Sequence, residues 1–148
     1  GNMKLMINGA VTLGTLDGAN VEIHEQVGDN NIFLFGLKTP EVNELWQKGY
    51  HPMDYVYADP QLRDVIDFLK GGINGMRFDE IVNSLLNHDP YMCLADFHDY
   101  VRAQCDVSAA YGNKRLFTNM SLVNTAKAGF FSADRSVSEY AKNIWHTR

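Results

Sequence analysis

The hydrophobic pattern of residues 1–20 changes between helical and extended character. Residues 1–8 are mostly apolar and predict a helix that Asn2 caps. The β-branched and apolar run VTLGTL that follows predicts a strand with little exposure on either face. After the turn at Asp17-Gly18, a second helix is expected over Ala19–Val27. Helix, strand and helix in so short a stretch are typical of a doubly wound α/β sheet.

A second short apolar strand is expected at Ile32–Gly36. The connection before it has the length of a helical crossover, so the two strands should pair in parallel through a right-handed connection. No further strand is expected after Gly36. The rest of the chain reads as helices, at residues 39–48, 60–70, 79–87, 96–111, 118–128 and 136–145.

Three of these helices have clear starting signals. Thr39 and Asp59 stand as caps directly before prolines, and Ser136 with Glu139 has the spacing of a capping box. Asn113 is expected to end the longest helix. The stripes predicted to face inward are Val42, Leu45 and Trp46; Leu62, Val65, Ile66 and Leu69; Ile81, Val82, Leu85 and Leu86; and Phe97, Val101 and Cys105.

So many helices carry more apolar surface than a two-stranded sheet can cover, and such a sheet is marginal in water. We therefore expect an α/β fold that is mostly helical: a partial doubly wound (Rossmann-like) sheet of two short parallel strands with about seven or eight helices. Residues 1–148 would form a single truncated domain. The open edges of its sheet predict self-association into a homo-oligomer.

Composition narrows the range of partners. Thirteen basic and eighteen acidic side chains leave a net charge of −5, and no basic stripe is present, so neither nucleic acid nor a membrane is expected as a partner. Cys93 and Cys105 have no CxxC spacing and are expected to be reduced, buried packing residues of a cytoplasmic protein. No leader and no apolar run of membrane-spanning length is recognised.

The opening helix also offers candidate chemistry. Gly1 and Asn2 would lie where a helix presents unpaired N–H groups and the positive end of its dipole, and the Lys4 amine would lie one turn away. This spacing suits a phosphorylated aldehyde cofactor. A lysine on a solvated helix face gives the same pattern, so the residues alone leave both interpretations open.

Other binding and catalytic patterns are incomplete. Gly9 and Gly14 have the spacing of a phosphate-binding loop but lack its lysine. His24-Glu25 begins like a zinc-binding helix, yet Gly28 stands where the second histidine is required, so no metal site is expected. No nucleophile motif is visible, and the catalytic residues are unknown. The many aspartates fit either a glycosidase pair or simple helix caps.

Several stretches together resemble the α-glucan phosphorylases, the family of glycogen and maltodextrin phosphorylase. They follow the order of that family's C-terminal part: GNMK with NGAVTLGTLDGANVEI, NIFLFG, the Gly49-Tyr50 pair, NHDPYMCLADFHDYV and FFSADRSVSEYAKNIW. The resemblance implies a pyridoxal 5'-phosphate cofactor. Lys4 matches the lysine that forms the Schiff base, and Gly1 matches a glycine whose backbone N–H helps to hold the cofactor phosphate. In this family that phosphate exchanges a proton with orthophosphate, so Lys4 would be a tether.

The resemblance also implies the fold and reaction of the parent enzyme. This chain would be the C-terminal part of the cofactor-bearing domain of a two-domain (GT-B) glycosyltransferase that transfers terminal glucosyl units of glycogen or maltodextrin to orthophosphate, giving glucose 1-phosphate. Family residues that bind glucose and orthophosphate lie upstream of Gly1, so we expect the chain alone to be inactive and to hold little cofactor. The alternative is a non-catalytic, self-associating module. A sugar-nucleotide glycosyltransferase of the same architecture is disfavoured because it needs no cofactor lysine.

Overall fold

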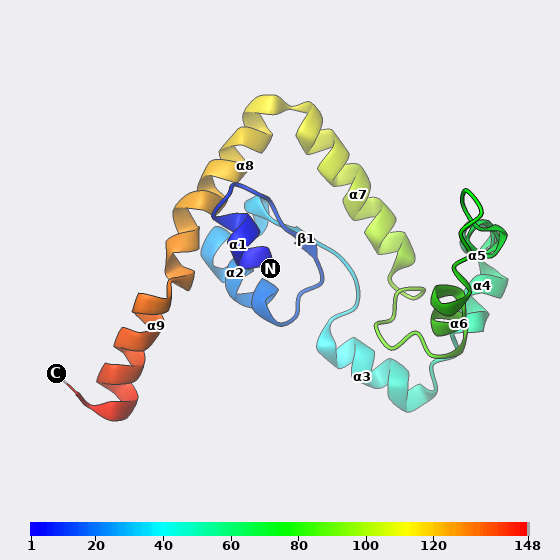
Figure 1. The fold of residues 1–148 in the computed structure, drawn as a ribbon, viewed down its shortest axis with the longest axis horizontal. Helices are drawn as coiled ribbons and strands as arrows, with labels where there is room; N and C mark the ends of the chain where they lie inside the picture. Colours follow the sequence, from blue (N-terminus) through cyan, green and yellow to red (C-terminus); the bar gives the residue numbers. More distant parts are fainter. Residues whose placement is uncertain (148) are drawn as a thin grey trace. The chain divides into compact units, whose positions relative to one another are not determined.

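A pair of short parallel strands lies in the N-terminal part of the computed structural model, which describes residues 1–147 (Figure 1). Strand β1 (Leu13–Gly14) pairs with β2 (Phe33–Leu34), and Leu13 lies opposite Phe33. The predicted parallel pairing is confirmed, although each strand is only two residues long. Within the described residues no further strand follows β2.

Helix α2 (Ala19–Val27) and the 3₁₀ turn η1 (Asp29–Asn31) connect the two strands, as the long crossover of a parallel pair requires. The bounds of α2 agree with the prediction. Helices make up most of the remaining chain. In order they are α1 (Asn2–Met6), α3 (Thr39–Lys48), α4 (Pro52–Ala58), α5 (Pro60–Gly71), α6 (Asp79–Asn87), α7 (Phe97–Gly112), α8 (Lys114–Lys127), the 3₁₀ turn η2 (Ala128–Phe131), α9 (Ala133–Tyr140) and the π-helical turn η3 (Ala141–Trp145).

The tertiary contacts fall into two compact units. Unit 1 combines Gly1–Leu34 with the chain from Ala103 onward, and unit 2 is Phe35–Arg102. The expectation that residues 1–148 form one truncated domain stays a prediction, and its last residue lies outside the described part of the chain. No described helix is both long and apolar enough to cross a bilayer.

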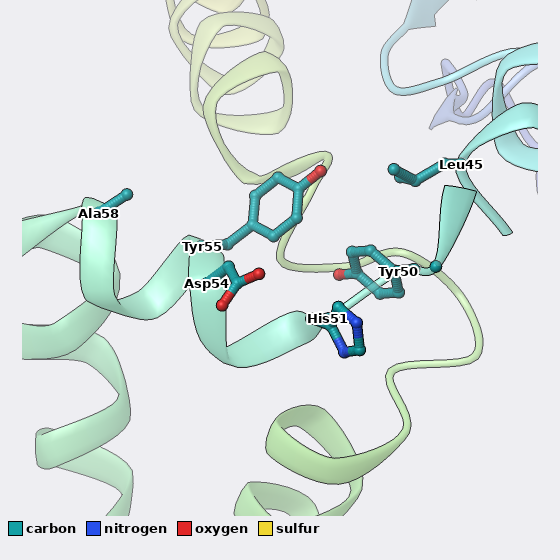
Figure 2. A pocket seen from close by; sticks show the side chains of 7 residues that line it. Leu45, Tyr50, His51, Asp54, Tyr55 and Ala58 are labelled. Atoms are coloured by element: carbon teal, nitrogen blue, oxygen red, sulfur yellow. The ribbon is translucent and has the colours of Figure 1, made fainter.

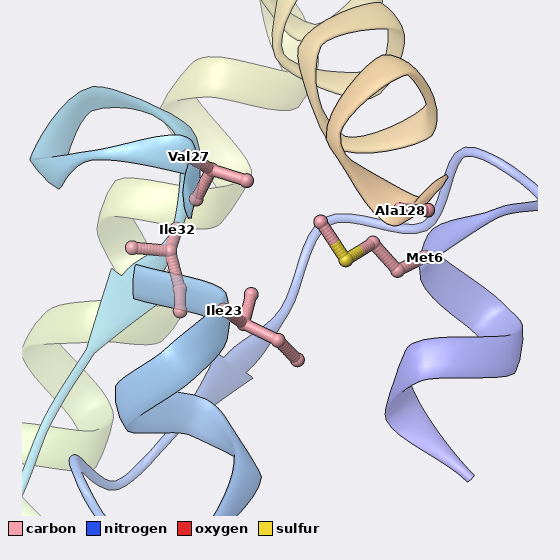
Figure 3. Packing of buried hydrophobic residues seen from close by; sticks show 5 residues of the cluster. All are labelled: Met6, Ile23, Val27, Ile32 and Ala128. Carbon is pink, nitrogen blue, oxygen red and sulfur yellow. The ribbon is translucent and has the colours of Figure 1, made fainter. Parts of the chain in front are cut away.

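The core of unit 1 joins helix α1 to residues that lie far away in the sequence. Met6 packs with Ile23 and Val27 of α2, with Ile32 before β2, and with Ala128 at the start of η2 (Figure 3). Met6 and Ile23 are fully buried. Burial of each large apolar side chain contributes roughly 2 kcal/mol, so this cluster holds α1 against α2 and the end of α8.

The core of unit 2 is built by short helices that follow one another in sequence. Val56 of α4, Leu62 and Ile66 of α5, Val82 of α6 and Leu94 form one buried cluster. The predicted cap of α5 is confirmed, because Asp59 Oδ1 accepts the backbone N–H groups of the first turn at 2.8 and 3.4 Å. The predicted bounds of α6 are confirmed as well.

Two local predictions in unit 2 are wrong, and helix α4 was not predicted at all. The cap of α3 is Lys38, whose N–H donates to Glu41 Oε2 at 2.7 Å, and Thr39 is already helical. Trp46, which was predicted to face inward, is 45% exposed, and none of the residues of α3 is buried. Helix α4 starts at Pro52, a favoured first helical position, but it is too short to show a helical hydrophobic period.

Other predicted inward positions are also exposed. Val65 of α5 and Ile81 of α6 are exposed, and the buried positions of these two helices are Leu62, Ile66 and Val82. Cys93 and Cys105 are free and exposed, so the prediction that they are buried is wrong. Small side chains, Ala103 among them, form the buried face of α7 instead.

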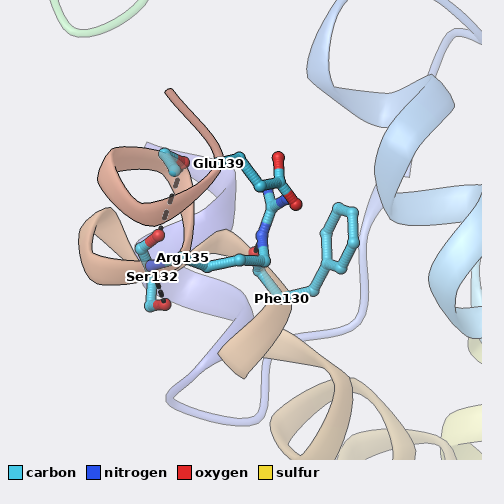
Figure 4. A network of polar contacts seen from close by, with 5 residues as sticks. Phe130, Ser132, Arg135 and Glu139 are labelled. Carbon is cyan, nitrogen blue, oxygen red and sulfur yellow. Dashed lines mark hydrogen bonds and ion pairs between the residues drawn. The ribbon is translucent and has the colours of Figure 1, made fainter. Parts of the chain in front are cut away.

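The boundaries of the last helices differ from the predicted ones. Asn113 does not simply end α7: its side chain caps α8 by accepting the N–H of Leu116 at 3.1 Å. The capping box at Ser136 is wrong, because α9 starts earlier and Ser132 caps it. Glu139 lies in the second turn of α9, where Arg135 pairs with it at 2.5 Å and also lies over the Phe130 ring (Figure 4).

Candidate cofactor site

The side chain of Lys4 lies on the exposed face of helix α1. Met3 and Met6, its neighbours on the helix, pack on the core cluster of unit 1 and so fix the orientation of that face. No acidic residue lies in the first turn of α1, and among residues 1–147 the Lys4 amine has no hydrogen-bond or ion-pair partner. The amine is therefore available to a ligand.

Gly1 is the N-cap of α1, and its carbonyl accepts the N–H groups of Lys4 and Leu5, both at 3.1 Å. Apart from Gly1 itself and the adjoining backbone, no heavy atom of the described residues lies within 4 Å of the position that a Cβ at Gly1 would occupy, so the backbone here is open to a ligand. The prediction that Asn2 caps the helix is wrong. Asn2 is the first helical residue, and its side chain turns to a partner elsewhere in unit 1.

That partner is Asn20 on helix α2. Asn2 Nδ2 donates to Asn20 Oδ1 at 2.7 Å, and Asn20 Nδ2 donates to the carbonyl of Thr15 at 2.8 Å. A Cβ at Gly14 would lie 2.7 Å from Asn20 Nδ2, so this position of β1 needs glycine for close approach. The amide of Asn20 thus ties the turn that carries Lys4 to the loop after β1.

Side chains of helix α8 hold the loop that follows α1 and the turn η1. Ser121 Oγ donates to the carbonyl of Gly9 at 2.7 Å, and Asn124 Nδ2 donates to the carbonyl of Asn31 at 2.8 Å. Gly9 has φ +84°, and a Cβ there would lie 2.6 Å from Ser121 Oγ. The hydroxyl of Ser121 therefore lies against the loop that has the glycine spacing of a phosphate-binding loop. Sequence reasoning missed Asn20, Ser121 and Asn124, because each forms a hydrogen bond to a residue at least 18 positions away in the sequence.

Helix α1 has only five residues, fewer than the eight predicted from the apolar pattern. Fewer aligned peptide groups give a smaller dipole, so the helix start alone makes a weak phosphate site. A free amine beside an open glycine backbone remains as the group that fits an aldehyde cofactor.

The sequence also offered aspartates and histidines as candidates for acid–base catalysis or metal binding. Several of these side chains pair with a neighbour in the structure. Asp79 Oδ2 accepts from Arg77 Nε at 2.8 Å, and this bond lowers the pKa of the Asp79 carboxyl. His24 pairs with Asp29, and His98 pairs with Asp59, each at 2.5 Å. In residues 1–147 no three His, Cys, Asp or Glu side chains converge as a metal site.

Comparison with known proteins decides the family. The family model described as "Carbohydrate phosphorylase" matches residues 1–147. This chain belongs to the carbohydrate phosphorylase family. The resemblance found in the sequence is confirmed, and the opening GNMK segment lies within the matched range.

Individual phosphorylases match nearly the whole chain. It is 45% identical to the muscle form of glycogen phosphorylase of Homo sapiens, 46% to that of Ovis aries and 45% to the glycogen phosphorylase of Synechocystis sp.. Each match covers 98% of this chain but only 18% of the relative. The chain therefore spans less than a fifth of the length of these phosphorylases.

Proposed function

We propose that this chain is the cofactor-bearing segment of an α-glucan phosphorylase, which transfers terminal glucosyl units of glycogen or maltodextrin to orthophosphate. The observation that carries the proposal is the match to the phosphorylase family over residues 1–147. The exposed Lys4 amine has no partner among these residues, and the resemblance equates it with the family's cofactor lysine. On this proposal the chain forms part of the C-terminal, doubly wound domain of a GT-B enzyme. Its two parallel strands and helical cover are consistent with that role.

The residues of α1 have separate tasks in this proposal. Lys4 anchors pyridoxal 5'-phosphate through its amine, and the open backbone of Gly1 contributes to holding the phosphate group. When bound, the cofactor supplies a phosphate that exchanges a proton with orthophosphate. The Asn2–Asn20 bond, 2.7 Å long, keeps the anchoring turn in place.

Covalent labelling tests Lys4 without any assay of activity. The chain is incubated with pyridoxal 5'-phosphate and reduced with borohydride, and the labelled lysine is located by peptide mass spectrometry. Label is expected mainly at Lys4 and is expected to disappear in Lys4→Ala. Lys127→Ala, which removes an exposed lysine in the last turn of α8, is the matched control. Equal labelling of many lysines, or unchanged total label in Lys4→Ala, would contradict the proposal.

We further propose that the isolated chain has no phosphorolytic activity, because it holds a small part of the length of its relatives. Glucose 1-phosphate is measured after incubation of the chain with maltoheptaose, orthophosphate and pyridoxal 5'-phosphate. None is expected above a blank without protein. Release of glucose 1-phosphate that depends on Lys4 would show instead that the segment is catalytically sufficient.

A second proposed role for the isolated chain is a non-catalytic, self-associating module. A two-stranded parallel sheet has two outer edges that can accept a strand from another copy. Sedimentation velocity at micromolar concentration is expected to show dimers or larger species. A monodisperse monomer would exclude this role. Cys93 and Cys105, which are free, fit the cytoplasmic location that we propose for the protein.

A further inference from the structure

Unit 2 contains a hollow of about 370 Å³ between the end of helix α3 and helix α4. Leu45 contributes to its wall from α3, and Tyr50 and His51 come from the link between the helices. Asp54 and Tyr55 come from α4. Figure 2 shows the Asp54 carboxylate and the His51 ring beside the two tyrosine rings, so polar and aromatic groups border the same space. Gly1 and Lys4, the residues proposed to hold the cofactor, belong to unit 1 and do not line this hollow.

The aromatic wall of the hollow is held in a defined geometry. The rings of Tyr50 and Tyr55 lie 5.4 Å apart with a tilt of 58°, and the Trp46 ring meets Tyr50 edge-on at 5.6 Å. The Tyr50 hydroxyl donates to the buried Asp89 carboxylate at 2.6 Å. Asp89 in turn accepts two backbone N–H groups at 2.9 and 2.8 Å, which prevents it from turning away.

The bond to Asp89 also tunes the Tyr50 ring. Burial and the bond to Asp89 raise the pKa of Tyr50, so the phenol keeps its proton. A phenol that donates to a carboxylate gains electron density in its ring, which strengthens the negative potential on the ring face. Such a face attracts a cation.

The charged groups around the hollow also favour a cationic ligand. The Asp54 backbone N–H donates to the carbonyl of His51 at 3.1 Å, whereas its carboxylate, which borders the hollow, has no hydrogen-bond or ion-pair partner among residues 1–147. A neighbouring hollow of about 280 Å³ shares Leu45 and Tyr55 and carries Glu41 and Glu44. Lys48, the lysine on its rim, already pairs with Glu44. The two hollows therefore present a net negative potential to solvent.

We propose that this hollow binds a small alkylated ammonium ion, with the cation between the tyrosine faces and the Asp54 carboxylate. Aromatic faces combined with a carboxylate are the usual recognition elements for such ligands. A phosphate or carboxylate ligand would be repelled by Asp54 and the two glutamates. A sugar ring would need several directional polar partners, whereas the Tyr50 hydroxyl is committed to Asp89.

Choline chloride is the probe, and Trp46 is the reporter. The chain has two tryptophans, so Trp145→Phe leaves Trp46 alone beside Tyr50. Choline is titrated at constant ionic strength, with sodium chloride as the balancing salt. We expect a saturable change in Trp46 emission with a millimolar dissociation constant. The neutral isostere 3,3-dimethyl-1-butanol is expected to bind at least tenfold more weakly, because it lacks the charge.

Matched variants locate the site. Asp54→Asn and Tyr55→Leu are expected to weaken choline binding at least fivefold. Asp64→Asn on α5 and the exposed Tyr57→Leu on α4 line neither hollow and are expected to leave it unchanged. Circular dichroism confirms that each variant is folded before it is titrated.

Four results would overturn the proposal. They are the absence of a saturable signal in the folded chain, equal binding of the neutral isostere, unchanged binding by folded Asp54→Asn, and tighter binding of maltose than of choline.

Discussion

The two units of the chain bury their cores over very different distances in sequence. In unit 1, Met6 packs with Ala128, and Ser121 bonds to the carbonyl of Gly9, 112 positions earlier. In unit 2, the buried cluster lies wholly within residues 56–94. Contacts between distant residues must overcome more loop-closure entropy before they form. The turn that carries Lys4 therefore depends on the last third of the chain, whereas the hollow beside Tyr50 depends on residues of unit 2, the most distant of them Asp89, 39 positions after Tyr50.

The units also differ in their buried polar groups. Unit 2 buries the carboxylates of Asp89, which accepts two backbone N–H groups, and of Asp96, which accepts the N–H of Leu37. Unit 1 buries the amide of Asn124, which carries no charge. A pKa that differs between the folded and unfolded states couples folding to pH; because the shifted pKa values of Asp96 and Asp99 belong to unit 2, this unit should be pH-sensitive.

The largest expected effect of a single substitution is that of Asp89→Ala. This change leaves three donors without a partner: the Tyr50 hydroxyl and the N–H groups of Cys93 and Leu94. Unit 2 should lose about 3–5 kcal/mol of unfolding free energy. Urea unfolding followed by Trp46 fluorescence measures the loss. Asp64→Ala, on the exposed face of α5, is the control and should change little; similar losses in both variants would show that the buried bonds are unimportant.

Met6→Ala tests whether the two units respond separately. The side chain is fully buried, so its loss should cost about 3 kcal/mol. Amide hydrogen exchange is expected to accelerate in α1, α2 and α8, while α4 to α6 stay protected. Ile66→Ala, in the other core, should produce the reverse pattern. Uniform acceleration across the chain by either variant would mean that the units unfold together.

Asn20→Ala should loosen the turn that carries Lys4. It removes the acceptor of Asn2 and the donor to the Thr15 carbonyl, which should cost about 1–2 kcal/mol. Labelling of Lys4 by pyridoxal 5'-phosphate and borohydride is expected to fall together with stability. Asn8→Ala removes an exposed bond to the Lys4 carbonyl and is the control. Unchanged labelling in Asn20→Ala would show that the reaction of Lys4 with the cofactor does not depend on the Asn2–Asn20 bond.

The smallest expected effects concern two carboxylates of unit 2 with opposite pH behaviour. Burial raises the pKa of Asp96 above its ordinary value of 3.8; the Leu37 N–H opposes this shift, and Asp99, Asp89 and Glu41 add to it. Its contribution to stability is therefore present at low pH and is lost as the pH rises above that value. The bond from Arg102 lowers the pKa of Asp99, so its contribution is present above the ordinary value and is lost as the pH falls.

Urea unfolding from pH 3 to pH 8 separates the two carboxylates. In the original chain the Leu37 N–H donates to Asp96 Oδ1 at 2.8 Å, and the amide oxygen of Asp96→Asn can still accept this bond. Because the variant has no carboxylate to ionise at this position, its stability should fall less between acidic and neutral pH. Asp99→Asn should lower stability at neutral pH and have little effect at pH 3. Parallel pH profiles for both variants and the original chain would contradict these assignments.

Local sequence signals were sufficient for much of the secondary structure and for the family. The bounds of α2 and α6 and the cap at Asp59 follow from neighbouring residues, because helix propensity, proline and side-chain caps act within one turn. The motifs around Lys4 were sufficient for recognition of the phosphorylase family. Helix α4 was not predicted, because seven residues are too few to show a helical hydrophobic period.

Only the tertiary structure decided which partners the polar side chains choose. Asn2 is a residue type that favours helix caps, but its side chain bonds to Asn20. Ser132, and not Ser136, caps α9, and Glu139 pairs with Arg135 inside the helix. The exposure of Cys93 depends likewise on which neighbours fold over it. A side-chain hydrogen bond forms with whichever partner the packed backbone brings within about 3 Å, and sequence spacing does not contain that information for residues far apart in the chain.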